Sequence, residues 1–347
     1  MAHQMTKNDA AASLYVGSPA WHRKGQVATL DELMGPDGKP KTFREIMVSK
    51  GLIYDVKPVE VFGVVLVEQP DGTLKEVVVE FPEYVGIYRG DNHLGLAIHN
   101  DGYTIGQNEE LAAMLDAMNA GAHDGRVIDP EAFVSMKDGR IVAVTGKFRG
   151  QIVLPGGDVI DPYVVARTSH NGEFLTGLRS CMFRVVCRNT LNASMLGKAQ
   201  LDFSCKHTLG REDQIAKGTK DAVAFVNDVR NFEAEARAMI EATVTDMEFR
   251  ALVETVLPYK GDTELQRSKV DTQRAAVAGI WSGDERVGGY KGTAWGAFQA
   301  VSTWEQWVQP GKDLDGRNMT ATLGRGFVVS NHAGRLLAPA PREVVPV

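Results

Sequence analysis

The sequence has few of the residues that mark disulfide scaffolds, secreted chains or membrane proteins. Its 347 residues include 3 cysteines, an odd number that leaves no fully paired disulfide framework and favours a reducing compartment. No run approaches the roughly 20 consecutive apolar residues that a membrane span requires. The first residues, MAHQMTKNDAAASLYVG, are polar and lack the hydrophobic stretch of a signal peptide. We therefore expect a cytoplasmic protein of bacterial or phage origin, without a membrane partner.

Motifs for nucleotide and metal chemistry are also missing. The sequence contains no GxxxxGK[ST] phosphate-binding loop, which argues against work driven by ATP. Its histidines are scattered without carboxylates at ligand spacing, and there is no CxxC pair, so we expect no metal site. No cofactor is predicted.

Positive charge is scarce overall but concentrated in one segment. The formal net charge is −6, so the whole protein is not a general nucleic-acid binder. Between positions 163 and 211, seven basic residues face two acidic ones, a local charge of +5. The basic residues are Arg167, Arg179, Arg184, Arg188, Lys198, Lys206 and Arg211. This asymmetry points to an anionic partner at that place.

Alternating apolar residues and turn dipeptides predict β-hairpins up to about residue 211. The turns are expected at Asp71-Gly72, Asp138-Gly139 and Asn171-Gly172. Two helices cross this region: a short one ended by Gly51, and one capped by Asn108 and ended by Gly121. A third helix is predicted from near Phe183 into RVVCRNTLNASML, entered directly from a strand.

After Leu209 the pattern becomes charged and helix-periodic, with apolar residues at three- and four-residue steps. The predicted fold class is α+β: a mostly antiparallel sheet with crossing helices, followed by a helical C-terminal region. The expected division is an irregular N-terminal segment (1–50), an α+β core with the basic segment (51–211), a helical region (212–310) and a C-terminal extension and tail (311–347).

The stretch LRSCMFRVVCRNTLNASM, residues 178–195, contains the strongest candidate binding site. Phosphate binding needs cations spaced along a surface with neutral donors between them. The candidate nucleic-acid contacts are Arg167, Arg179, Arg184, Arg188, Asn189, Thr190, Asn192, Lys198 and Lys206. The alternative is that these arginines pair with carboxylates of the helical region, a use of arginine that is common in protein interiors.

A catalytic interpretation is weaker. Cys187, His170 and Asn189 have the residue types of a cysteine hydrolase. Cys187 lies in an apolar run, however, where a buried inert thiol is the usual outcome. His170 belongs to a predicted hairpin turn. No catalytic residue is therefore assigned.

The C-terminal aromatic residues allow two interpretations. Trp281, Tyr290, Trp295, Phe298, Trp304 and Trp307 are rich enough in ring surface to stack bases. Their helical spacing favours a core or a subunit interface instead. We expect the helix around Trp295 and Trp304 to mediate self-association, since large exposed apolar patches mark interfaces.

Three segments together resemble a known family. TSHNGEFLTGLRSCMFRVVCRNTLN, YVGSPAWHRKG and YKGTAWGAFQAVSTWEQW are similar, in order, to signature elements of the phage/plasmid-like proteins of the domain-of-unknown-function 932 type. The segment STWEQW departs from the pattern of that family, so no histidine there receives a role. The resemblance implies a function in phage or plasmid DNA metabolism, or against the host.

The layout of hairpins, a crossing helix and an arginine-rich segment is also similar to phage single-strand annealing recombinases, by analogy of architecture. The expected function is therefore single-stranded DNA binding or annealing in recombination or replication, by a homo-oligomer and without a chemical step. The alternatives are an anti-defence or regulatory protein that binds a host protein through the acidic helices, and a hydrolase that uses Cys187.

Overall fold

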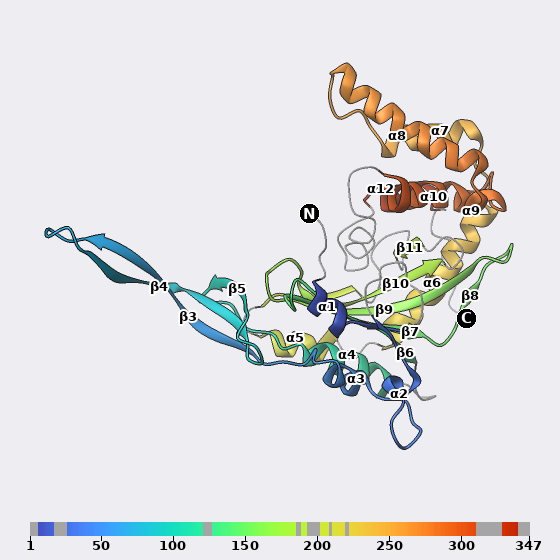
Figure 1. The fold of residues 1–347 in the computed structure, drawn as a ribbon. Coiled ribbons are helices and arrows are strands. Elements are labelled where there is room, and N and C mark those ends of the chain that lie inside the picture. The colour runs from blue at the N-terminus through green and yellow to red at the C-terminus, as the bar shows by residue number, and fades with distance from the viewer. Residues whose placement is uncertain are drawn as a thin grey trace.

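A computed structural model describes residues 6–16, 26–120, 127–184, 189–192, 202–207, 210–218, 222–309 and 328–338. It contains a central sheet, a second sheet that extends away from it, and a helical lobe at the C-terminal end (Figure 1). Sheet pairing is antiparallel apart from the short β1–β2 pair, so the predicted α+β class with mostly antiparallel strands is confirmed.

The central sheet is built around four long neighbouring strands and has the order β11-β10-β9-β7-β6-β1-β2. In addition, β12 pairs with β10, and β8 pairs with β9. Its strands are β1 (Leu14–Tyr15), β2 (Gln26–Val27), β6 (Ile128–Met136), β7 (Ile141–Phe148), β8 (Ile152–Val153), β9 (Val159–Ser169), β10 (Thr176–Arg184), β11 (Asn189–Asn192) and β12 (Asp202–Cys205). The predicted hairpins β6–β7 and β9–β10 are confirmed.

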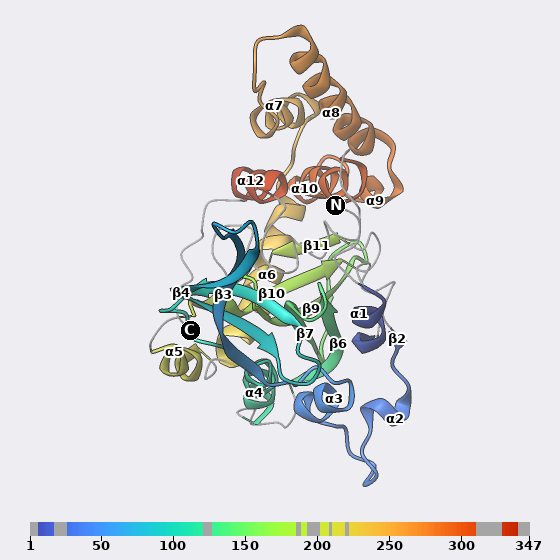
Figure 2. The same ribbon diagram turned by 60° about the vertical axis from the view of Figure 1, so that its left-hand side comes forward.

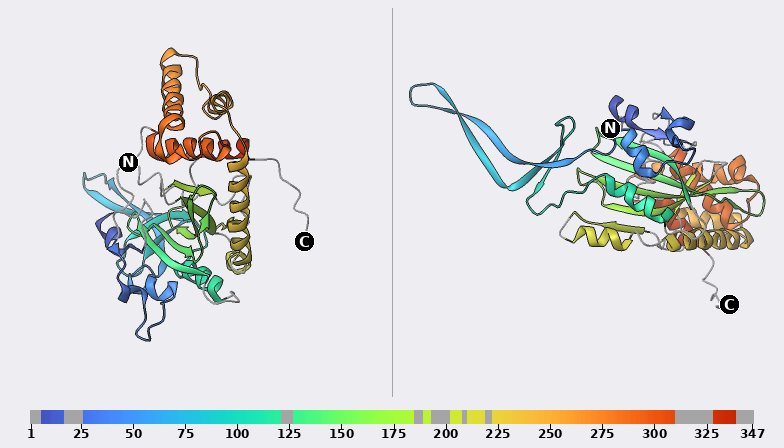
Figure 3. Two further views of the ribbon diagram at one scale, coloured as in Figure 1. Left: turned by 90° about the vertical axis from the view of Figure 1, so that its right-hand side faces the viewer. Right: turned by 90° about the horizontal axis from the view of Figure 1, so that it is seen from below.

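The second sheet contains the third predicted hairpin. Its strands are β3 (Val56–Glu68), β4 (Leu74–Arg89) and β5 (Gly95–Asn100), in the order β3-β4-β5. β5 pairs with β4 only from Tyr84 to Tyr88, so the rest of the hairpin projects from the body of the protein (Figures 1 and 3). We call residues 59–83, the part beyond the contact with β5, the arm.

The helices begin at threonine caps in several places, as their sequences favour. Thr42, Thr245 and Thr263 each form a capping box with the residue three positions on. Before and along the central sheet the helices are α1 (Lys7–Ala12), α2 (Leu30–Leu33), α3 (Phe43–Ser49), α4 (Glu109–Ala120), α5 (Arg211–Gly218) and α6 (Ala222–Glu241). The helical lobe contains α7 (Asp246–Val256), α8 (Glu264–Gly283), α9 (Glu285–Gly288), α10 (Ala294–Thr303), the π-helix η1 (Trp304–Val308) and α12 (Val328–Leu337).

The main core lies against one face of the central sheet. Val144, Val164 and Met182 share that face and pack in one cluster with apolar residues of α3, α4, α6 and α10. The opposite face has its own buried cluster, which includes Val165 and Phe183. The lobe has a further core between α7, α8 and α10 (Figure 2).

Helix α10 is buried on all sides, which corrects the prediction of a self-association surface there. Trp295 and Phe298 face the core of the sheet, whereas Trp304 belongs to the core of the lobe. Trp295 and Trp304 are both 0% exposed. A helix that is apolar all round is an interior helix. These aromatic residues join the sheet to the lobe within one chain, so Trp295 and Trp304 do not form the exposed patch that was expected, and self-association stays a prediction.

The helix predicted from Phe183 onward is wrong. Residues 189–192 form β11, which pairs antiparallel with β10 so that Thr190 lies opposite Phe183. A short segment that directly follows a strand does not by its sequence alone distinguish a helix from a further strand.

Candidate functional site

Two of the predicted phosphate contacts lie together on the central sheet. Arg167 on β9 is paired with Gly177, and Arg179, two positions along β10, is paired with Val165. Residues paired across antiparallel strands point to the same side, so both arginines lie on one face as diagonal neighbours. Both are half-buried, and the Arg167 guanidinium lies 5.8 Å from the centre of the Phe174 ring.

Arg184 lies on the other face and does not belong to a surface ribbon. It is five positions from Arg179, and an odd separation in a strand reverses the side. Its side chain is 2% exposed, with Nε 2.5 Å from Oδ2 of Asp158 and Nη1 2.8 Å from the carbonyl oxygen of Arg286. The indole Nε1 of Trp295 donates to the same carboxylate oxygen at 3.1 Å. Arg184 therefore ties the sheet to the lobe and is closed to a phosphate. It pairs with a carboxylate, but Asp158 directly precedes β9 and does not belong to the helical region that the alternative named.

The other members of the predicted set are only partly placed. Lys206 is exposed directly after β12. The backbone of Asn189, Thr190 and Asn192 runs along β10 in β11 and not in the predicted helix. Arg188 and Lys198 lie outside the described residues.

The structure separates two members of the proposed cysteine-hydrolase group. His170 follows β9 at the turn of the β9–β10 hairpin, whereas Asn189 pairs with Arg184 at the far end of β10. The nine residues of β10 span roughly 25–30 Å at about 3.3 Å per residue. His170 and Asn189 are therefore not within reach of a common substrate atom. Cys187 lies outside the described residues.

Three histidines that are scattered in the sequence meet beside the base of the second sheet. Tyr103 stacks between His99 and His207, with ring centres 3.8 Å and 4.8 Å apart. The Nε2 of His99 lies 2.7 Å from the carbonyl oxygen of His170, whose own Nε2 is 2.9 Å from Oδ1 of Asn108. The side-chain amide of Asn108, the residue directly before α4, also donates to the carbonyl oxygen of Leu52. This amide therefore links His170 to the segment that leads into β3.

Burial and nearby cations favour the neutral forms of His170 and His207. Burial, followed by the charges of His207 and Arg211, lowers the pKa of His170 from 6.5 to about 3. Burial and the Arg211 charge lower the pKa of His207 from 6.5 to about 4. Arg211 forms an ion pair with Glu110 and donates to Oγ1 of Thr176. The network fastens the second sheet to the central sheet. Among the described residues, no group of three or more histidine, cysteine, aspartate or glutamate side chains could hold a metal ion.

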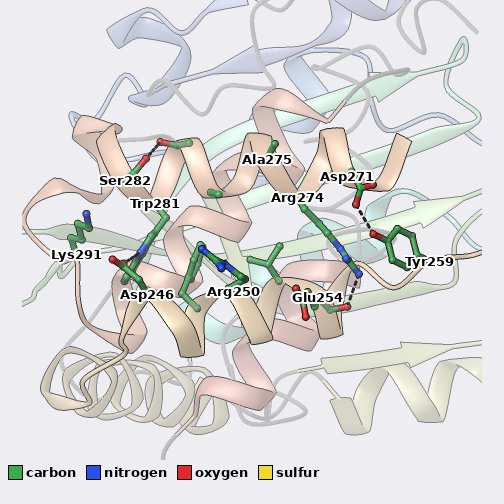
Figure 4. Close-up of a pocket in the computed structure, with 14 residues that line it drawn as sticks. Asp246, Arg250, Glu254, Tyr259, Asp271, Arg274, Ala275, Trp281, Ser282 and Lys291 are labelled. Carbon is green, nitrogen blue, oxygen red and sulfur yellow. Dashed lines mark hydrogen bonds between the residues drawn. The ribbon is translucent and has the colours of Figure 1, made fainter. Parts of the chain in front are cut away.

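The lobe contains a cleft between α7 and α8 with a volume of about 620 Å³ (Figure 4). Its inner wall includes Phe249 and Trp281, whose rings stack 4.4 Å apart, and Asp246 accepts a hydrogen bond from the Trp281 indole at 2.7 Å. At the other end, the hydroxyl of Tyr259 donates to Asp271 at 2.6 Å. This volume lies within the usual range for a small-molecule or peptide site.

The rim of the cleft is charged but balanced. Three basic and three acidic side chains line it: Arg250, Arg274, Lys291, Asp246, Glu254 and Asp271. Arg274 lies over the Tyr259 ring at 4.4 Å and donates to the carbonyl oxygen of Leu257. The balance suits a ligand with both charges, such as a peptide, better than a polyanion.

Neither the histidine network nor the cleft could be predicted from local patterns in the sequence. The histidines lie on different elements, at positions 99, 170 and 207, so only the fold brings them together. The cleft depends on the spacing of α7 and α8. One sequence feature that indicates the cleft is the set of small residues on α8, Ala275, Ala278 and Gly279. Their short side chains leave space between α8 and α7.

Comparisons with known proteins identify the family but no activity. No curated protein and no solved structure matches the chain. No helix within the described ranges is both long enough and apolar enough to span a membrane. A family model described as a domain of unknown function (DUF932) matches residues 95–323, well over half of the 347 residues. The chain therefore belongs to the DUF932 family.

Proposed function

We propose that the protein binds single-stranded DNA and promotes annealing, as a phage-encoded oligomer in recombination or replication. One observation supports this proposal best: Arg167 and Arg179 lie as diagonal neighbours on one face of the central hairpin, inside the segment of charge +5. Cations spaced along adjacent strands suit a phosphate backbone that crosses the sheet. Annealing needs two strands held extended and neutralised, so the proposal requires no chemical step.

The same face indicates how a strand would be bound. Tyr163 and Phe183 lie on it with ring centres 6.1 Å apart, but they are only 5% and 7% exposed. A strand that reached the half-buried arginines would not stack on these covered rings. We therefore expect backbone contacts without base stacking here, and so little sequence preference.

The test is the salt dependence of binding to a labelled oligothymidine, measured by fluorescence anisotropy. For single strands the affinity should fall on a log–log salt plot with a slope of about 0.7 per phosphate contacted. Arg167→Gln with Arg179→Gln should reduce that slope by about 1.4 if each arginine contacts one phosphate. Absence of binding at about 50 mM salt, where such contacts are strong, would reject the proposal.

A matched control removes the same charge elsewhere. Arg149 and Arg237 are about half exposed and paired with Asp129 and Glu233 on the surface. Arg149→Gln with Arg237→Gln should leave the salt slope nearly unchanged. If this control lowers the slope as much as the first pair does, the effect is one of net charge, and the β9–β10 face is not the site.

The alternative is an anti-defence or regulatory protein that binds a host protein, and the α7–α8 cleft is the observation that favours it. An apolar wall with a rim of both charges fits a short peptide segment. Ala278→Trp would fill the cleft, because Ala278 lines it and is exposed. Loss of a host-directed effect in this variant, with DNA binding absent in the wild type, would favour the alternative.

A further inference from the structure

The arm has no core of its own. The apolar cluster at the base of the second sheet consists of Tyr54, Val56, Ile87 and Leu96, all outside residues 59–83. Beyond this cluster the arm is a ribbon of two strands that projects from the body (Figure 3). A ribbon of two strands is marginally stable in water by itself, so a long one needs a surface to pack on.

One face of the arm is apolar and carries no carboxylate in its paired stretch. The pairing register sets Val65 opposite Val77, Gly63 opposite Val79 and Val67 opposite Lys75. The Phe81 ring lies on the same side, 3.4 Å from the position that a Cβ of Gly63 would take. We call this side the apolar face. Its large apolar side chains, at 38–45% exposure, are Val65, Val67, Val77, Val79 and Phe81.

The opposite face, which we call the acidic face, alternates apolar residues with glutamates. Three of its four cross-strand pairs join one apolar residue to one glutamate: Phe62 with Glu80, Leu66 with Glu76, and Leu74 with Glu68. The apolar side chains of this face are 54–63% exposed. Within the described residues the three glutamates form no ion pair. Each carboxylate is therefore available to a cation of another molecule.

The exposed apolar area is that of an interface. Eleven large apolar side chains of the arm, at 38–63% exposure, leave on the order of 1,000 Å² of apolar surface in water, above the few hundred Å² that soluble monomers tolerate. A standard protein–protein interface buries about 800 Å² from each partner. The arm alone therefore supplies the area that a stable complex requires.

The charge of the arm decides among the possible occupants. Residues 59–83 contain six acidic residues and one lysine, a net charge of −5. Such a surface repels nucleic acid and anionic lipid. It also repels the arm of a second copy, because like charges brought together across an interface are costly. A protein surface with positive charge is attracted instead.

We propose that the arm docks into a groove of a different protein, with an apolar wall against the apolar face and lysine or arginine side chains against the acidic face. A ribbon held in a groove is covered on both faces at once, which accounts for the apolar residues on each. The apolar contacts supply the core of such an interface, and the charge pairs supply its specificity. The arm lies outside residues 95–323, so it adds a partner site to the family region. Docking of this kind does not depend on DNA binding.

The first test measures, by fluorescence anisotropy, binding of the full chain to a labelled short peptide of alternating leucine and lysine. The matched probe has glutamate in place of lysine and should bind about tenfold more weakly or not at all. Val65→Thr with Val77→Thr removes apolar surface from the apolar face but keeps residues that favour strands. This arm variant should bind the leucine–lysine peptide about tenfold more weakly, with an unchanged circular dichroism spectrum. Equal binding of the two peptides, or wild-type affinity in the arm variant, would overturn the proposal.

A control variant removes apolar side chains from another surface. Met247 and Leu265 are 79% and 67% exposed on α7 and α8. Met247→Thr with Leu265→Thr should keep the wild-type affinity for the leucine–lysine peptide. If this variant loses as much affinity as the arm variant, exposed apolar residues anywhere on the chain are sufficient, and the arm is not the site.

The second test removes charge from the acidic face. Glu76→Gln with Glu80→Gln should weaken binding of the leucine–lysine peptide by about two- to fivefold per glutamate at low salt, and by less at high salt. Glu241→Gln with Glu285→Gln removes the same charge from exposed positions on α6 and α9 and should leave the affinity unchanged. Equal losses in the two double variants would mean that net charge alone attracts the peptide, and the proposal would be rejected.

The other possible occupants are tested with the same arm variant, Val65→Thr with Val77→Thr. Flotation with vesicles of phosphatidylcholine, alone or mixed with phosphatidylglycerol, should leave the wild type unbound. Sedimentation should give the wild type and the arm variant the same mass, whatever the oligomeric state of the wild type. Vesicle binding that the variant abolishes would assign the arm to a lipid surface, and a lower mass of the variant would assign it to a second copy. Either result would overturn the proposal.

Discussion

The protein contains two long antiparallel hairpins that use opposite kinds of residue. The β9–β10 hairpin lies inside the body and buries polar groups, among them Arg184, His170 and Ser180. The arm lies outside and exposes valines, leucines and phenylalanines. In the first hairpin each of these polar groups has a partner: Ser180 donates to Asp228 at 2.5 Å, and Arg184 is paired with Asp158.

This contrast separates structural residues from candidate functional ones. Buried charges of β9–β10 that are fully paired hold elements together, since an unpaired buried charge is costly. Exposed apolar residues of the arm are only partly covered within the chain, and apolar patches of this size usually mark interaction surfaces. Of the basic segment, only Arg167, Arg179 and Lys206 are described and at least partly accessible.

The largest expected change in the free energy of unfolding comes from a buried residue of the β9–β10 hairpin. Arg184→Gln leaves the Asp158 carboxylate buried without its cation, which should cost about 3–5 kcal/mol in the free energy of unfolding. Arg149→Gln removes an exposed ion pair with Asp129 and should cost about 0–1 kcal/mol. Urea unfolding of both variants measures the difference. Equal small losses would mean that Arg184 is not a structural residue.

The sequence predicted the hairpins well because their signals are local. Asp71-Gly72, Asp138-Gly139 and Asn171-Gly172 each lie in a turn of the structure, with positive φ angles at Gly72, Gly139 and Gly172. A turn of this kind needs a residue that tolerates positive φ, and that requirement is visible in two adjacent letters.

The candidate site was harder to predict, because the burial of a side chain depends on which distant segments pack against it. Arg179 and Arg184 look alike in the sequence, yet the strand turns them to opposite faces, and only one face contains Asp158. The predicted helix over 184–196 placed positions 184 and 188 on one face and so suggested a basic track. Residues 189–192 form the strand β11 instead, so that helix does not run through the segment.

A second, smaller effect is expected from acid pH. His170 and His207 have pKa values lowered from 6.5 to about 3 and about 4, so below pH 6.5 the unfolded chain binds more protons than the folded one. Stability should therefore be highest above pH 6.5 and fall as the pH drops, by about 2 kcal/mol per histidine at pH 5. Chemical unfolding at several pH values measures this slope.

The control for the pH effect is a histidine in solvent. His170→Gln should flatten the dependence of stability on pH, whatever it does to stability at neutral pH. His93→Gln, at an exposed position, should leave that dependence as it is in the wild type. If the two variants have the same pH slope, the loss of stability in acid comes from other groups than the histidine network.

The smallest effect compares one substitution in both hairpins. Val164 on β9 is 0% exposed, and Val78 on β4 is 60% exposed. Val164→Ala removes two buried methyl groups and should cost on the order of 1–2 kcal/mol, through lost burial and a cavity. Val78→Ala should change the stability of the monomer by less than about 0.5 kcal/mol, as surface substitutions do. Both are measured by unfolding at low protein concentration, where assembly does not contribute. A cost for Val78→Ala as large as that for Val164→Ala would mean that the arm packs within its own chain, and the contrast between the hairpins would disappear.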